Sequence, residues 1–179
     1  TLLIEAAMMA ADMAPNLMRE RFGFHGWMGH DEAAWRELKR EAEARAGIGR
    51  RRCRSHFYGF DQSPAALAAA KANAMRAGIP ALITLEGAGL GELARPAGLP
   101  DLPGLVVTNP PYGERLGELP ELVTLYARLG ERVKAAFPGW QLAVFTANPD
   151  LGHRIGLRAH KQYALRNGPL EAKLLLMAV

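Results

Sequence analysis

The sequence predicts an α/β fold, in which a mainly parallel sheet is covered by helices and is closed by an antiparallel hairpin at the C-terminal end. Helical and strand patterns alternate along the chain, which is typical of parallel sheets. Residues 80–86 and 104–108 are short, mainly apolar runs, as expected of buried strands. Two further strand patterns flank the turn residues 167–169, Asn-Gly-Pro, and predict the hairpin.

The first two helices are predicted from apolar spacing and from residues that begin or end helices. Residues 1–14 form a largely apolar run and predict a buried helix. Residues 31–46 have one apolar face, with Asp31 placed to cap the first turn. Gly47 and Gly49 follow this pattern and predict its end, because glycine commonly terminates helices.

The third helix has a clear start, since Ser63 can cap it and Pro64 fits its first position. The remaining predicted elements are strands at residues 56–61, 80–86, 104–108, 141–146, 160–166 and 171–178, and helices at residues 64–77, 120–137 and 149–156.

The composition is that of a globular protein. The chain has 179 residues, of which 49% are hydrophobic and 22% charged, which excludes disordered and collagen-like proteins. The longest apolar stretch is interrupted by Glu5 and Asp12 and is too short to cross a bilayer, so no membrane contact is expected. Cys53 is the single cysteine, which excludes an internal disulfide and favours a reducing compartment, the cytoplasm.

The net charge of +4 is unevenly distributed. Residues 134–179 contain six Lys and Arg residues against two acids, Asp150 and Glu171. A second basic cluster consists of Arg50, Arg51, Arg52 and Arg54. Both clusters suit an anionic polymer such as RNA, although a solvated helix end explains the second one equally well.

Asp61 ends the predicted strand 56–61, directly before the capped helix. Ligands of open α/β sheets bind beyond the carboxyl ends of the strands. A carboxylate only accepts hydrogen bonds, so Asp61 could hold both hydroxyl groups of a nucleotide ribose. A turn-forming role beside Ser63 remains an equal alternative.

Asn109, Pro110, Pro111 and Tyr112 follow the predicted strand 104–108 at once. The two prolines remove backbone donors and stiffen the loop, leaving the Pro110 carbonyl free to accept. This carbonyl and the Asn109 side-chain oxygen could together hold a planar amino group, while Tyr112 stacks on the attached ring. Such orientation alone can lower a reaction barrier by several kcal/mol.

Asn109 to Tyr112 match the (N/D)PPY motif of class I S-adenosylmethionine-dependent amino-methyltransferases, and Asp61 matches their ribose-binding acid. The whole chain resembles the bacterial 23S rRNA guanine-N2 methyltransferases of the RlmL type. The matching segments are TLLIEAA at residues 1–7, FGF to Trp27, His30-Asp31 to Trp35, NPPYGERL at residues 109–116, Asp150-Leu151, Lys161-Gln162-Tyr163 and Asn167-Gly168-Pro169-Leu170.

This resemblance implies a Rossmann-like class I methyltransferase fold and methyl transfer from S-adenosylmethionine to the exocyclic amine of a guanine in 23S rRNA. Asn109, Pro110 and Pro111 would form the loop that orients this amine, and Tyr112 would stack on the extruded base. Asp61 would hold the cofactor ribose. Extrusion of a base costs a few kcal/mol, which stacking and hydrogen bonds must offset.

Further cofactor contacts implied by the resemblance lie at Thr1, Gln62, Ala88, Gly89 and again Asn109. Family members tend to have an acid near the adenine, where this chain has Gly89. Glu86 or Glu92 is expected to replace that acid, or the adenine is held by backbone and packing.

The resemblance also implies that residues 1–179 are a single, N-terminally truncated catalytic domain. Family members carry a first strand and a glycine-rich loop just before the residue that matches Thr1, and an RNA-binding THUMP domain further upstream. The sheet would then lack its central strand. We therefore expect weak or no cofactor binding by the chain alone.

Several other residues are candidates for binding. His25, His30 and Asp31 could be metal ligands, but packing or surface roles explain them better, and no metal site is expected. Phe22, Phe24 and Trp27 predict either a hydrophobic lid over the sheet edge or a surface for RNA bases. Cys53 has no pattern of catalytic partners and is expected to be a plain thiol. The segment Gly113-Glu114-Arg115 is expected at the substrate entrance.

Three other functions are alternatives to this one. A DNA-adenine or protein-glutamine methyltransferase would present a similar planar amino group to Asn109, but the continuation to Leu116 and the predicted hairpin disfavour it. A noncatalytic RNA-binding module is compatible with the missing cofactor loop. A nicotinamide-dependent oxidoreductase is disfavoured, because the G-x-G-x-x-G fingerprint is absent from the sequence.

Overall fold

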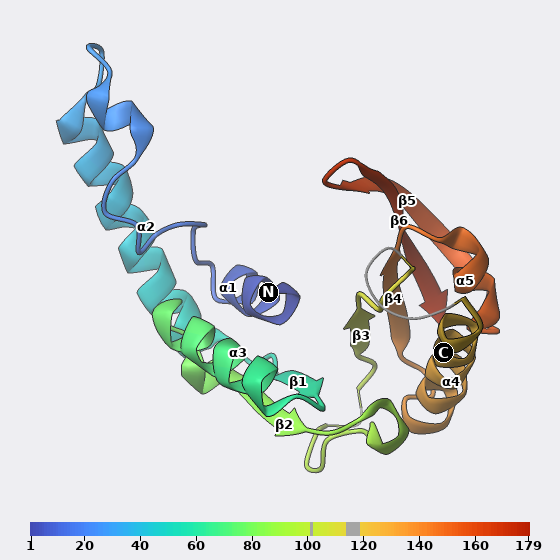
Figure 1. The fold of residues 1–179 in the computed structure, drawn as a ribbon. Helices are drawn as coiled ribbons and strands as arrows, with labels where there is room; N and C mark the ends of the chain where they lie inside the picture. Colours follow the sequence, from blue (N-terminus) through green and yellow to red (C-terminus); the bar gives the residue numbers. More distant parts are fainter. Residues whose placement is uncertain (101, 114–118) are drawn as a thin grey trace. The chain divides into compact units, whose positions relative to one another are not determined.

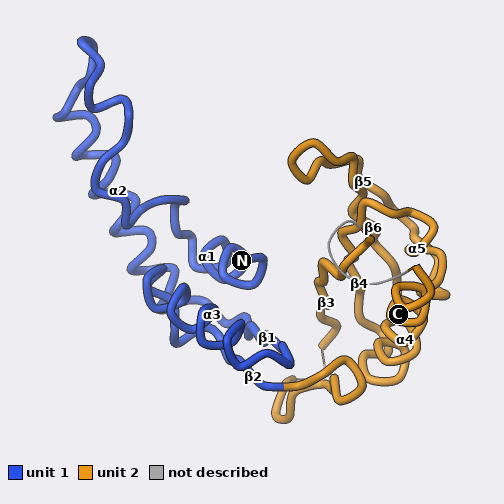
Figure 2. Tube along the Cα trace, in the orientation of Figure 1, with its two compact units in different colours: residues 1–87 blue, residues 88–179 orange. Residues whose placement is uncertain are grey.

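The computed structural model describes residues 1–100, 102–113 and 119–179. The chain divides into two compact units, Thr1–Gly87 and Ala88–Val179 (Figure 2). Each unit contains its own sheet and its own cluster of buried apolar side chains.

The first unit contains a two-stranded parallel sheet, formed by β1 (Phe57–Asp61) and β2 (Ile83–Gly87) (Figure 1). Two helices, α1 (Leu2–Ala10) and α3 (Pro64–Arg76), contact both strands. The other elements of this unit are the short 3-10 helices η1 (Gly23–Gly26) and η2 (Pro80–Leu82) and the long helix α2 (Glu32–Arg52).

The sequence predicted that α2 would end at Gly47 and Gly49, and this prediction is wrong because α2 continues to Arg52. Gly49 lies inside the helix at a point of close approach to α1. A Cβ atom at Gly49 would lie 1.8 Å from the carbonyl oxygen of Ala11, whereas one at Gly47 would meet only the Arg51 side chain, at 3.7 Å. Gly49, interpreted from the sequence as a helix end, therefore marks the contact between α2 and the end of α1.

The first helix is shorter than the predicted residues 1–14, since α1 ends at Ala10. Asp12 has a positive φ of 51°, which a continuing α-helix does not allow. Its carboxylate accepts two hydrogen bonds from Arg45 of α2, at 2.6 and 3.0 Å. Beside this ion pair the small side chains of Ala7, Ala11 and Ala46 are buried, which lets the two backbones approach closely.

The second unit contains a four-stranded sheet in the order β3-β4-β6-β5. β3 and β4 are parallel, whereas the β4/β6 and β5/β6 pairs are antiparallel. Its elements are η3 (Leu90–Glu92), β3 (Leu105–Thr108), α4 (Leu119–Ala136), β4 (Gln141–Thr146), α5 (Pro149–Arg154), β5 (Ala159–Asn167) and β6 (Leu170–Ala178).

The core of the second unit lies between α4 and the sheet. Leu122, Tyr126, Leu129 and Val133 recur at helical spacing along α4 and are all buried. They pack with buried side chains from β4, α5 and β6, namely Leu142, Val144, Leu151, Leu175 and Met177.

The predicted α/β class and the C-terminal hairpin are confirmed. The predicted strand at residues 80–86 is only partly correct, because Pro80–Leu82 forms a 3-10 turn before β2 begins. Proline has no N–H to contribute to a strand ladder, and the Leu82 N–H donates to the Ile79 carbonyl instead, at 3.1 Å. Among the described residues, no helix is both long and apolar enough to cross a membrane.

Candidate functional site

The loop Asn109 to Tyr112 begins where the β3/β4 ladder ends, as the sequence predicted. The last residue of β3, Thr108, pairs with Val144 of β4, and Asn109 is the next residue. Asn109 is exposed, while Pro110 is buried. The loop is thus fixed by the burial of Pro110, and the Asn109 side chain faces solvent, where a ligand can reach it.

The loop offers a ligand two hydrogen-bond acceptors, the Asn109 side-chain oxygen and the Pro110 carbonyl. Among the described residues, no group donates a hydrogen bond to the Asn109 side-chain oxygen or to the Pro110 carbonyl. Two acceptors without donors can take both protons of a planar amino group and leave its lone pair unoccupied. No acid or base is needed for this function, only orientation.

Tyr112 is held from two sides. Its ring is half-buried and packs against the hydrophobic core of the second unit. Its hydroxyl group accepts a hydrogen bond from the side-chain amide of Asn167, the last residue of β5. Asn167 was predicted as a turn residue only, so its contact with Tyr112 is an addition that no local pattern of the sequence indicates.

A buried hydrogen-bond chain at the end of β4 lies near this loop. Tyr126 of α4 donates to Thr146 at 3.1 Å, and the Thr146 hydroxyl donates to the Asn148 carbonyl at 3.2 Å. The Asn148 side chain in turn caps α5 by accepting from the Asp150 and Leu151 N–H groups. Burial is the main cause that raises the pKa of the Tyr126 hydroxyl above its ordinary value. The chain connects α4, β4 and α5 at the carboxyl end of β4.

In the first unit, Asp61 lies at the carboxyl end of β1 and is exposed. One carboxylate oxygen accepts from the Ser63 N–H at 2.8 Å, which is the turn-forming role considered from the sequence. Among the described residues, the other oxygen has no hydrogen-bond partner. The turn therefore orients the carboxylate and leaves one oxygen for a ligand hydroxyl, so both interpretations of Asp61 are compatible.

Three of the other residues implied in cofactor binding directly follow the ends of β1 and β2 in the chain. Gly87 pairs with Asp61 in the β1/β2 register, and Ala88 and Gly89 follow it in the chain. Gln62 is exposed, and Thr1 is the exposed residue that precedes α1.

Of the two acids considered near the adenine, Glu92 is oriented by its own turn. One of its carboxylate oxygens accepts a hydrogen bond from the Gly89 N–H at 3.0 Å and so caps η3. Glu86 is exposed on β2. Both acids remain candidates for this role. The segment Glu114, Arg115 and Leu116, expected at the substrate entrance, lies outside the described residues.

A hollow of about 260 Å³ occurs in the first unit, but at the wrong end of the strands for this site. It is lined by residues 53–58, which include Cys53, Arg54 and His56 before β1, and by Ala81, Leu82 and Thr84 around the start of β2. Ligands of parallel α/β sheets bind at the carboxyl ends instead.

Exposed basic and aromatic residues gather on the β5 strand. Eight of its nine residues are exposed, and the Lys161 ammonium lies 5.0 Å from the centre of the Tyr163 ring. Phe22 and Phe24, by contrast, pack with Trp35 of α2, at ring-centre distances of 5.3 and 5.0 Å, rather than over a sheet edge. Trp27 remains 72% exposed.

Comparison with known proteins identifies the family. The family model UPF0020, described as an RMKL-like methyltransferase domain, matches residues 1–175. The chain belongs to this family. The predicted methyltransferase class is thereby confirmed, and Asn109 to Tyr112 can be interpreted as part of a methyltransferase domain.

Curated members with similar sequences carry the name "Ribosomal RNA large subunit methyltransferase K/L". The protein of Chromohalobacter salexigens is 70% identical over all 179 residues, which make up 24% of its length. The protein of Pseudomonas putida is 48% identical over 181 residues, again 24% of its length. This chain therefore spans about a quarter of the relatives that it matches.

Three solved structures share the fold. SMU.472, described as a methyltransferase and crystallised with SAH, aligns with a TM-score of 0.85 and 28% identity, over 98% of this chain and 44% of its own. A protein of Clostridium difficile, described as a possible methylase, gives the same TM-score and identity, over 99% of this chain and 45% of its own. A protein of Listeria monocytogenes is described as a predicted N6-adenine-specific DNA methylase. It aligns with a TM-score of 0.80 and 29% identity, over 97% of this chain and 42% of its own.

Proposed function

We propose that this chain is part of an S-adenosylmethionine-dependent enzyme that methylates the exocyclic N2 amine of a guanine in 23S rRNA. The observation that carries this proposal is the position of Asn109 and Pro110, two acceptors without donors among the described residues, at the carboxyl end of β3. The 70% identity to a ribosomal RNA large subunit methyltransferase supports rRNA as the polymer.

The residues fit the cofactor in one testable respect, namely that the exposed Asp61 carboxylate has one oxygen left for a ribose hydroxyl. When bound, S-adenosylmethionine supplies the methyl group. Asn109 and Pro110 would accept the two amine protons of the guanine and direct its lone pair. Tyr112, fixed by Asn167, would stack on the ring of the extruded base.

We further propose that 23S rRNA reaches this site along β5, where basic side chains and Tyr163 are exposed. Additional RNA-binding surface, such as a THUMP domain, is expected in the longer polypeptide, since the relatives are about four times as long as this chain. Such an enzyme would act in the cytoplasm.

The test uses a chimera in which this chain replaces the matching residues of the Chromohalobacter relative. The chimera is incubated with labelled S-adenosylmethionine and, in separate reactions, unmodified 23S rRNA or DNA, and each product is digested to nucleosides. We expect the label in N2-methylguanosine. Label in N6-methyladenine of DNA instead, as the description of the Listeria structure suggests for that protein, would overturn the substrate assignment while retaining the site. Label in neither polymer would overturn the catalytic proposal.

The contact between Asn167 and Tyr112 gives a second prediction. In the chimera, Asn167→Ala and Tyr112→Phe should each lower kcat of methyl transfer by up to about tenfold, because each removes one hydrogen bond that fixes the stacking ring. The double variant should be no slower than the slower single variant. Additive losses would show that the two side chains act independently and would contradict the contact.

A further inference from the structure

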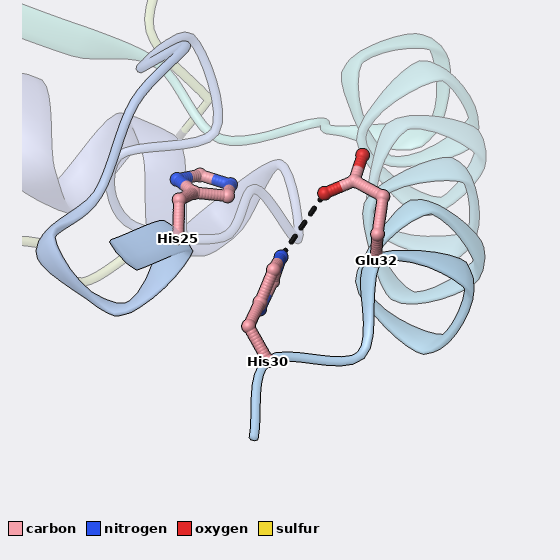
Figure 3. Close-up of side chains that lie close together, drawn as sticks. All are labelled: His25, His30 and Glu32. Carbon is pink, nitrogen blue, oxygen red and sulfur yellow. Dashed lines mark hydrogen bonds and ion pairs between the residues drawn. The ribbon is translucent and has the colours of Figure 1, made fainter. Parts of the chain in front are cut away.

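A group of side chains outside the methyl-transfer site has the composition of a metal centre. His25, His30 and Glu32 lie at the junction between η1 and α2 (Figure 3). One ligand atom from each of these residues lies within 4.8 Å of the other two. We propose that these three side chains bind a divalent transition-metal ion such as Zn²⁺.

The distances require only small movements. A tetrahedral Zn²⁺ ion with bonds of about 2.0–2.1 Å holds its ligand atoms about 3.4 Å apart. The His30 Nε2 and Glu32 Oε2 atoms are already 3.0 Å apart. The Glu32 side chain is 50% exposed and can rotate toward an ion.

Metal binding by His25 requires one of its two tautomers. Its Nδ1 atom lies 2.8 Å from the Phe22 nitrogen and 3.1 Å from the Phe22 carbonyl oxygen. When Nδ1 accepts from the Phe22 N–H, the ring proton is on Nε2, which then cannot bind a metal. When Nδ1 instead donates to the Phe22 carbonyl, Nε2 carries a lone pair and is free to bind a metal. A backbone carbonyl that fixes the tautomer of a histidine ligand is typical of metal sites.

The two carboxylate oxygens of Glu32 have different partners. Its Oε1 atom accepts a hydrogen bond from Arg36 at 2.8 Å, which orients the group and leaves Oε2 toward His30. Asp31, the acid that the sequence placed beside the two histidines, is instead occupied as the N-cap of α2. The third ligand is thus Glu32, one residue further along the chain.

Two imidazole nitrogens and one carboxylate oxygen suit Zn²⁺ better than Mg²⁺ or Ca²⁺, which prefer oxygen ligands. Three protein ligands leave a fourth position for water. The bound ion would fasten the loop between His25 and His30 to the first turn of α2. This loop presents Trp27 and Met28, which are 72% and 106% exposed, so the ion would restrict the motion of the most exposed side chains in this region.

The test is a titration of the 179-residue chain with Co²⁺, followed by visible absorption, and displacement by Zn²⁺. We expect one equivalent to bind with the spectrum of a tetrahedral ion. His25→Ala and His30→Ala should each weaken binding by at least about tenfold, and Glu32→Gln, which keeps the shape of the side chain, should weaken it too. His153→Ala is the matched control, since this exposed histidine lies in the other unit.

A second readout is the midpoint of thermal unfolding. Zn²⁺ should raise this midpoint in the unchanged chain and in His153→Ala, because a ligand of the folded state stabilises it. It should leave the midpoint of His30→Ala unchanged. The proposal is overturned if no saturable Co²⁺ binding occurs, or if His25→Ala and His30→Ala bind Co²⁺ as tightly as the control.

Discussion

Asn109→Ala is expected to reduce methyl transfer by the chimera about 10²- to 10³-fold, with little change in its affinity for RNA. The substitution removes one of the two acceptors that would orient the target amine, and the remaining Pro110 carbonyl cannot fix the direction of the lone pair alone. Asn109 is exposed and, among the described residues, bonds to none, so the fold should be unaffected. The measurement is the single-turnover rate of methyl transfer to 23S rRNA at saturating RNA.

The control for this variant is Asn73→Ala, which removes a side-chain amide on α3 that, among the residues the structure describes, bonds only to the neighbouring Arg76. Its single-turnover rate should match that of the unchanged chimera. A comparable rate for Asn109→Ala and Asn73→Ala would contradict the assigned role of the loop, whatever the substrate proves to be.

Gly49→Ala should destabilise the first unit by about 3 kcal/mol or more, whereas Gly47→Ala should stabilise it by about 0.5–1 kcal/mol. The new methyl group at Gly49 would lie 1.8 Å from the Ala11 carbonyl oxygen, which is backbone and cannot rotate away. At Gly47 it would meet only the end of the flexible Arg51 side chain, at 3.7 Å. There the gain comes from the higher helix propensity of alanine.

These two variants serve as controls for each other, since they introduce the same methyl group two residues apart in one helix. Their urea unfolding, followed by circular dichroism, should give midpoints that shift in opposite directions. A rise of both midpoints would mean that α1 and α2 do not approach closely in solution.

The sequence predicted those features that depend on neighbouring residues. The start of α3 is one, because Ser63 caps the helix through its own Oγ atom, which accepts from the Ala66 N–H at 3.3 Å. The position of Asn109 is another, because the strand before it and the two prolines after it are contiguous. Local chemistry suffices for such features.

Other features depend on residues that are distant in the chain, and these the sequence could not provide. Glycine is equally suited to a helix end and to a close contact, so Gly49 could be interpreted only once its neighbour Ala11 was known. Asn167 and Tyr112 are separated by 55 positions, and nothing in either segment specifies the hydrogen bond between them. The contact between His30 and Glu32 is a related case, because the sequence placed both Asp31 and Glu32 beside His30, and only the structure shows that Asp31 caps α2 while Glu32 contacts the imidazole.

The exposure of β5 has a consequence for its charged side chains. β5 is an edge strand of its sheet, and an edge with free backbone groups can pair with the edge of another molecule. The charges of Lys161 and Arg166 oppose such pairing, and the same charges would attract RNA phosphates. On the proposed RNA path, Lys161 and Arg166 would therefore meet two independent demands, attraction of RNA and protection of the sheet edge.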